Sequence, residues 1–190
     1  MTTYLHIIEF IAMIFSIIGS YKMGSIQDED RNSLKNAFNS FYISNILLIL
    51  LASITGLIFL YIQMLFFTTT AILGHYNITK NKTVLLYKSS VSLIIILISL
   101  YLLIENNPTI KNFNLIEIFA AVLAIVGSYI ISIKRFEVYA FTMFIIADLL
   151  YIKIGVDNFL PFFIVQSIFF VILSLRGIFN LNKRSLNFVL

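Results

Sequence analysis

The chain contains no cysteine and no tryptophan, and only two histidines and two prolines among its 190 residues. Without cysteine it cannot form a disulfide, a thiolate metal site or a cysteine nucleophile. The two histidines, His6 and His75, are too few for a histidine-based metal site, so we expect neither a metal nor a cofactor. Without tryptophan, any aromatic surface for the membrane interface or for a ligand must come from tyrosine and phenylalanine.

Charged residues are scarce as well, at 12% of the chain against about 25% in a soluble domain. Hydrophobic residues make up 60% and gather in runs close to the length of about 20 residues that a helix needs to cross a bilayer. The composition therefore predicts an all-α integral membrane protein, with the lipid bilayer as a partner. We attribute the net charge of +4 to basic cytoplasmic loops and do not expect nucleic acid as a partner.

Seven apolar segments are predicted to be transmembrane helices. Charged or polar stretches separate them, as does a turn before Pro108, because the residue before a proline avoids the helical conformation. The weakest break is marked only by Ser53, Thr55 and Gly56, and one kinked helix is the alternative there. The segments cover residues 4–21, 37–53, 55–75, 85–104, 115–133, 138–154 and 159–179.

Basic residues predict the orientation of the chain. With seven spans the termini lie on opposite sides, and one side then collects eleven lysines and arginines while the other has only Lys111 and Lys153. Because basic loops stay in the cytoplasm, we expect an outside N-terminus and a cytoplasmic C-terminus in a bacterial inner membrane. The eleven residues are Lys22, Arg31, Lys35, Lys80, Lys82, Lys88, Lys134, Arg135, Arg176, Lys183 and Arg184.

Polar and small residues recur at fixed offsets, which indicates an internal repeat. Glu9 and the run Gly19-Ser20-Tyr21 return 108 residues later as Glu117 and Gly127-Ser128-Tyr129. A five-residue excess around residues 25–30 then changes the offset to 103. The pairs at that offset are Phe38 and Phe141, Phe41 and Phe144, Asn45 and Asp148, Gln63 and Gln166, Gly74 and Gly177, and Asn77 and Asn180.

The repeat predicts two parallel three-helix units within a single membrane domain. Repeat one covers residues 4–77 and repeat two covers residues 112–180. Three spans are an odd number, so a second unit following directly would be inverted. The segment at 85–104 has no counterpart and serves as a linker helix that restores the parallel orientation, in a 3+1+3 plan.

The stretch from Lys134-Arg135 through Ala147-Asp148 to Tyr151 resembles the PnuC-type vitamin transporters, within the SWEET and PQ-loop-like superfamily. The endings around Gly74-His75-Tyr76 and Arg176-Gly177 resemble the glycine-plus-aromatic ending of that family. This chain has Phe141 and Phe144 where the family carries tryptophans, and it has no Pro-Gln dipeptide. The YgjV-like group, which has a similar length and plan, is the runner-up.

The resemblance implies a carrier for a vitamin or nucleoside-like solute such as nicotinamide riboside. Transport would be facilitated diffusion by alternating access, with the substrate trapped by a separate cytoplasmic kinase. The absence of a phosphate-binding loop and the single acid deep in a segment favour the same mechanism. A YgjV-like structural or sensory protein without transport is the alternative. We expect no enzyme activity, and a homo-oligomer is a candidate assembly.

Asp148 and its repeat mate Asn45 are the main candidates for substrate binding. An acid near the middle of a bilayer costs about 2.5–3.5 kcal/mol and usually has a function. Phe38 and Phe41 precede Asn45 at helical spacing, as Phe141 and Phe144 precede Asp148. Residues at this spacing share one face of a helix, so each of the two helices offers two aromatic rings and one polar group on one face. That combination suits a flat solute with hydrogen-bonding edges. The competing interpretation of all six residues is helix packing.

Gln63 and Gln166 complete the predicted site, because a buried amide needs a protein partner or a wet cavity. We expect both to lie near Asn45 and Asp148 in one cavity between the repeats, with Phe41 and Phe144 flanking the ligand; glutamines that only join helices are the alternative. Glu9 and Glu117 are interpreted as interfacial charges at the outer helix ends, with an outer vestibule as the alternative.

Overall fold

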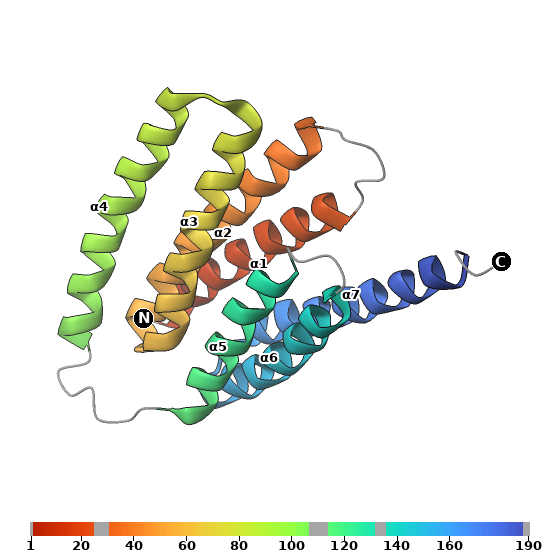
Figure 1. The fold of residues 1–190 in the computed structure, drawn as a ribbon. Helices are drawn as coiled ribbons and strands as arrows, with labels where there is room; N and C mark the ends of the chain where they lie inside the picture. Colours follow the sequence, from red (N-terminus) through yellow and green to blue (C-terminus); the bar gives the residue numbers. More distant parts are fainter. Residues whose placement is uncertain (1, 25–30, 107–113, 132–135, 188–190) are drawn as a thin grey trace. The chain divides into compact units, whose positions relative to one another are not determined.

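The computed structural model describes residues 2–24, 31–106, 114–131 and 136–187. Every element within these ranges is an α-helix, and there are seven (Figure 1). The five-residue excess at residues 25–30, the turn predicted before Pro108, Lys111 and the predicted basic residues Lys134-Arg135 lie outside the described residues. The helices are α1 (Thr2–Gly24), α2 (Arg31–Thr55), α3 (Ile58–Thr79), α4 (Lys82–Asn106), α5 (Leu115–Ile130), α6 (Glu137–Asp157) and α7 (Pro161–Asn187).

Six of the described helices are long and apolar enough to cross a membrane: α1, α2, α3, α4, α6 and α7. Their positions confirm the predicted all-α fold, since each predicted segment coincides with one helix. α5 is the exception in length, because it has 16 residues and ends at Ile130, before the end of the segment predicted at 115–133.

The chain divides into two compact units, α1 to α4 and α5 to α7, and each has a central helix. In the first unit α2 packs against α1, α3 and α4, and α4 also contacts α3. In the second unit α6 packs against α5 and α7. The helix predicted as a linker is therefore a packed member of the first unit.

The chain reverses between α2 and α3 at Gly56, whose φ is 77°. The amide of Leu57 donates to the carbonyl oxygen of Ala52 at 3.0 Å, which closes the last turn of α2. A left-handed residue with this bond is a common way to end a helix. The two predicted segments are therefore separate helices, and the alternative of one kinked helix is wrong.

The turn between α6 and α7 has the same geometry, 103 residues later. Phe159, with φ 55°, takes the place of Gly56. The amide of Leu160 donates to the carbonyl oxygen of Gly155 at 2.8 Å. Pro161 then begins α7, where its missing N–H loses no helical hydrogen bond.

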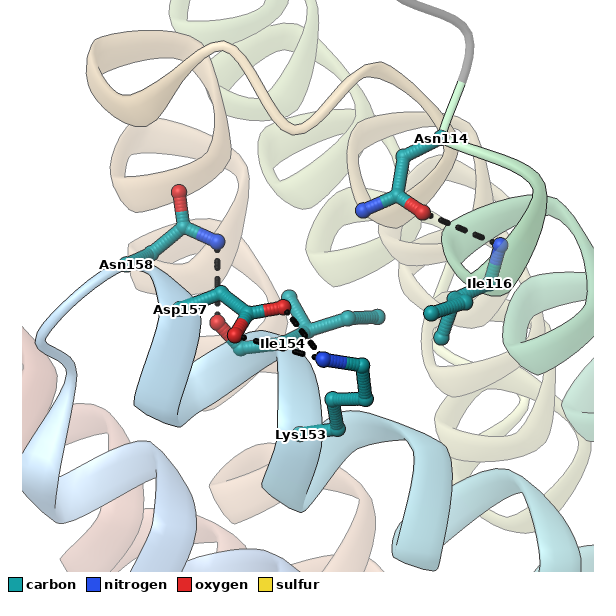
Figure 2. Close-up of polar contacts among 6 residues, drawn as sticks. All are labelled: Asn114, Ile116, Lys153, Ile154, Asp157 and Asn158. Carbon is teal, nitrogen blue, oxygen red and sulfur yellow. Dashed lines mark hydrogen bonds and ion pairs between the residues drawn. The ribbon is translucent and has the colours of Figure 1, made fainter.

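Local polar contacts hold the helix ends of the second unit (Figure 2). The side chain of Asn114 accepts a hydrogen bond from the amide of Ile116 at 3.0 Å and caps α5. Lys153 and Asp157 form an exposed ion pair of 3.1 Å, and the Asn158 side-chain nitrogen donates to the Ile154 carbonyl at 2.8 Å (Figure 2). The two asparagine contacts satisfy backbone groups that a helix leaves open at its ends.

Candidate functional site

The phenylalanines predicted to flank a ligand pack onto glycines of neighbouring helices. In the first unit Phe41 lies against Gly19 of α1, where a Cβ would meet the ring at 3.0 Å, and Phe38 lies against Gly74 of α3, where a Cβ would overlap the ring. Small residues allow such close approach of helices. Gly19 and Gly74 therefore leave the space that the rings of α2 fill.

The second unit repeats both contacts at the repeat positions. A Cβ on Gly127 of α5 would meet the ring of Phe144 at 3.0 Å. A Cβ on Gly177 of α7 would meet the ring of Phe141 at 2.6 Å. Each central helix thus places one phenylalanine on each of two neighbours, α1 and α3 in the first unit and α5 and α7 in the second. These contacts give the four rings a structural role within their own units, and the stacking role predicted for Phe41 and Phe144 stays a prediction.

In the first unit, buried polar side chains come from all three helices of the repeat. Asn45 on α2 is 7% exposed and Gln63 on α3 is 3% exposed. Because Phe38 packs on Gly74 in this antiparallel pair, Gln63 lies within about one turn of the level of Asn45. Glu9 on α1 is 1% exposed, and its carboxylate lies 3.0 Å from the Nδ1 atom of His6.

In the second unit, the corresponding residues are Glu117, Asp148 and Gln166. Glu117 and Gln166 are each 5% exposed, while Asp148 is half-buried. The hydroxyl of Tyr151 lies within electrostatic range of both Asp148 and Glu117. Tyr151 also stacks edge-on against Phe163 of α7, with ring centroids 5.5 Å apart.

Helix register places Asp148 and Gln166 at one level of the second unit. Asp148 lies one turn before Tyr151 on α6, and Gln166 lies one turn after Phe163 on the antiparallel helix α7. The Oε1 atom of Gln166 is buried and has no hydrogen-bond partner among the described residues. A buried amide oxygen without a donor costs about 1–3 kcal/mol, so this position is suited to a donor supplied by a ligand.

Glu9 and Glu117 are both buried against neighbouring helices, and Glu117 lies in the first turn of α5, as expected for a charge at a helix N-terminus. Each lies on a stripe of small residues that its helix turns towards the central helix of the unit. That spacing was the signal in the sequence that could have identified them as interior residues. The stripes are Glu9, Ala12, Ser16 and Gly19 on α1 and Glu117, Ala120, Ala124 and Gly127 on α5.

The two units differ in the contact between the first helix and the central helix. In the first unit the hydroxyls of Ser16 and Ser44 are hydrogen-bonded, and Ser44 also donates to the carbonyl oxygen of Ala12 at 3.0 Å. Ala124 and Ala147 occupy the equivalent positions in the second unit. The contact between α5 and α6 therefore lacks the pair of hydroxyls that joins α1 to α2.

The prediction that both polar sets share one cavity stays a prediction, since each set belongs to its own unit. No protein-family model, curated protein or solved structure matches this chain. The assignment of a function therefore rests on the chemistry of the two units.

Proposed function

We propose that this protein is a membrane carrier for a small, polar, ring-containing solute of the vitamin or nucleoside class. The observation that supports it is the duplication of a buried polar set, with a carboxylate on the first helix, an amide or acid on the second and an amide on the third. The two sets are Glu9, Asn45 and Gln63, and Glu117, Asp148 and Gln166.

The cost of burying polar atoms favours a binding role for Gln166, whose Oε1 atom is buried. A carboxylate or amide placed in hydrocarbon without a partner is costly. Helix packing alone does not require polar atoms, because the glycine and phenylalanine pairs already join the helices of each unit. A solute with hydrogen-bonding edges would supply the donor that the Gln166 oxygen lacks among the described residues.

The finer architecture belongs to the same proposal. We assign the three-helix sets as parallel repeats, with α4 restoring the orientation of the second, in a bacterial inner membrane with a cytoplasmic C-terminus. Nicotinamide riboside is the solute that the resemblance to PnuC-type carriers suggests. A cytoplasmic kinase would trap it after facilitated diffusion, and a homo-oligomer is the candidate assembly.

Uptake of radiolabelled nicotinamide riboside into proteoliposomes tests the proposal. Wild-type protein should admit the solute, and Asp148→Leu should abolish uptake while the protein remains inserted. Asp148→Asn should lower uptake of this cationic solute by about ten-fold, the loss expected for one charged contact. Asp157→Leu is the matched control, because Asp157 is an exposed acid on the same helix.

Two outcomes would contradict the proposal. A folded Asp148→Leu variant with normal uptake would exclude Asp148 from the binding site. Absence of flux for nicotinamide riboside and for a panel of vitamins and nucleosides would favour a protein without transport activity.

The mode of transport needs a separate measurement, because Glu9 and Glu117 are buried and Asp148 is not the only interior acid. Facilitated diffusion predicts that solute never accumulates above its external concentration when a proton gradient is imposed. Accumulation driven by that gradient would show coupled transport instead, and the carrier assignment would stand.

A further inference from the structure

Lys88 is a buried cation that no described carboxylate neutralises. It is the seventh residue of α4 and is 8% exposed. Its Nζ atom donates to the Oδ1 atom of Asn39 at 2.5 Å and lies 4.9 Å from the centroid of the Tyr42 ring. An ammonium group has three hydrogens to donate, and buried charges are ordinarily paired with an opposite charge. Among the described residues, a neutral amide and an aromatic face are the partners of the ammonium group, and neither carries a compensating charge.

The surroundings of Lys88 are held in place by hydrogen bonds between α2 and α4. The Tyr42 hydroxyl donates to the carbonyl oxygen of Lys88 at 3.2 Å. Ser92 donates to the same carbonyl at 2.8 Å, and its hydroxyl oxygen lies 3.2 Å from that of Tyr42. The ring therefore stays beside the ammonium group, and Asn39 keeps both hydrogens of its amide nitrogen for another acceptor.

Further positive charge lies near this position. Lys35, one turn before Asn39 on α2, interacts electrostatically with Lys88. The described acids of this unit, Glu9 and Glu105, lie towards the opposite ends of their helices. Asp28, Glu29 and Asp30 are outside the described residues. Within the described residues, this end of the first unit has an excess of positive charge.

We propose that Lys88 and Asn39 form a binding site for a phosphate group at the cytoplasmic end of the first unit. A lysine ammonium binds phosphate as a point charge, and the Asn39 amide donates to a second oxygen. Phosphate reaches this end of the helices in two forms, as the headgroup of an anionic lipid and as a soluble phosphate compound. This site is separate from the polar sets assigned to the carried solute and does not depend on that assignment.

Inorganic phosphate and phosphatidylglycerol are the two probes that distinguish a soluble phosphate ligand from a lipid headgroup. Thermal unfolding of the full chain is followed by tyrosine fluorescence in neutral detergent, with phosphate compared to chloride at equal ionic strength. Native mass spectrometry then measures retention of phosphatidylglycerol against phosphatidylcholine. A phosphate-dependent rise in melting temperature indicates a soluble ligand, and selective retention of phosphatidylglycerol indicates a lipid headgroup; either result supports the site.

Variants separate binding from a purely structural role of Lys88. Lys88→Met should abolish the response and Lys88→Arg should preserve it, while Lys153→Met, at an exposed lysine, serves as the control. Asn39→Asp is the decisive change, because it places a carboxylate against the ammonium group and leaves the helices joined. It should weaken phosphate or lipid binding by about ten-fold or more without lowering the melting temperature.

The proposal is overturned if the wild-type chain responds to neither ligand. It is also overturned if Asn39→Asp binds phosphate or phosphatidylglycerol as wild type does, since Lys88 would then only fasten α4 to α2. Should Lys88→Met fail to fold, Asn39→Asp still decides the question.

Discussion

At the scale of single residues, the contrast between Gly56 and Phe159 is informative. Both occupy the left-handed position that ends a central helix, but only one is glycine. The left-handed conformation costs an ordinary residue about 1–2 kcal/mol, because its Cβ crowds the following carbonyl. Phe159 is 83% exposed and so gains little packing in return. The second turn is therefore strained where the first is relaxed.

Phe159→Gly should raise the free energy of unfolding by about 0.5–1 kcal/mol, the strain relieved less the entropy that glycine adds to the unfolded chain. Thermal unfolding in detergent measures the change. Gly56→Ala is the reciprocal control and should lower stability by about 1 kcal/mol. A loss of stability in Phe159→Gly would show that the exposed ring has a role of its own.

The hydroxyl of Ser44 is a second residue-scale difference between the units. Ser44→Ala removes the hydrogen bonds to Ser16 and to the Ala12 carbonyl, both of which join α1 and α2. We expect a loss of about 0.6–1.7 kcal/mol, the range found for such bonds between membrane helices. Ser128→Ala is the control, since the bond of Ser128 among the described residues is to the Ala124 carbonyl of its own helix. Equal losses in the two variants would contradict an interhelical role.

At the scale of elements, phenylalanines and glycines join the helices of each unit. The central helix places one ring on each of two neighbours, and a glycine there leaves the space that the ring fills. Because the same two contacts occur in each unit, the spacing of glycine and phenylalanine in the sequence encodes which positions of neighbouring helices meet. Polar contacts then attach the extra helix α4, with the Tyr61 hydroxyl 3.2 Å from that of Ser99.

Gly177→Ala tests this packing, because the new methyl group would displace the ring of Phe141. Overpacking of this kind costs about 1–3 kcal/mol. Adding Phe141→Leu should restore part of the loss, so the double variant should be less destabilised than the sum of the single ones. A double-mutant cycle in detergent unfolding measures the coupling, and additive effects would show that the two residues are not in contact.

At the scale of the whole molecule, the basic residues show which helix ends face the cytoplasm in the proposed orientation. The described basic residues of the first unit cluster at the end of α1, the beginning of α2, the end of α3 and the beginning of α4. Consecutive helices run in opposite directions, so these positions share one end of the unit (Figure 1). Basic residues favour the cytoplasmic side of a membrane.

A reporter fused after Leu190 should therefore be active in the cytoplasm, and one fused before Met1 should be active outside. Paired alkaline phosphatase and green fluorescent protein fusions measure this directly. Fusions that place both termini on one side would show that one helix does not cross the membrane, with the short helix α5 as the first to examine.

The helices of this protein follow from its sequence alone, because long apolar runs broken by polar turns leave a chain in a bilayer no other way to satisfy its backbone. The offsets of 108 and 103 also predicted which positions would be equivalent, and the glycine and phenylalanine contacts occur at those positions. Tertiary structure decided which faces meet. It buried Glu9 and Glu117 and gave Lys88 its neighbours, because burial depends on contacts between helices that spacing along one helix does not specify.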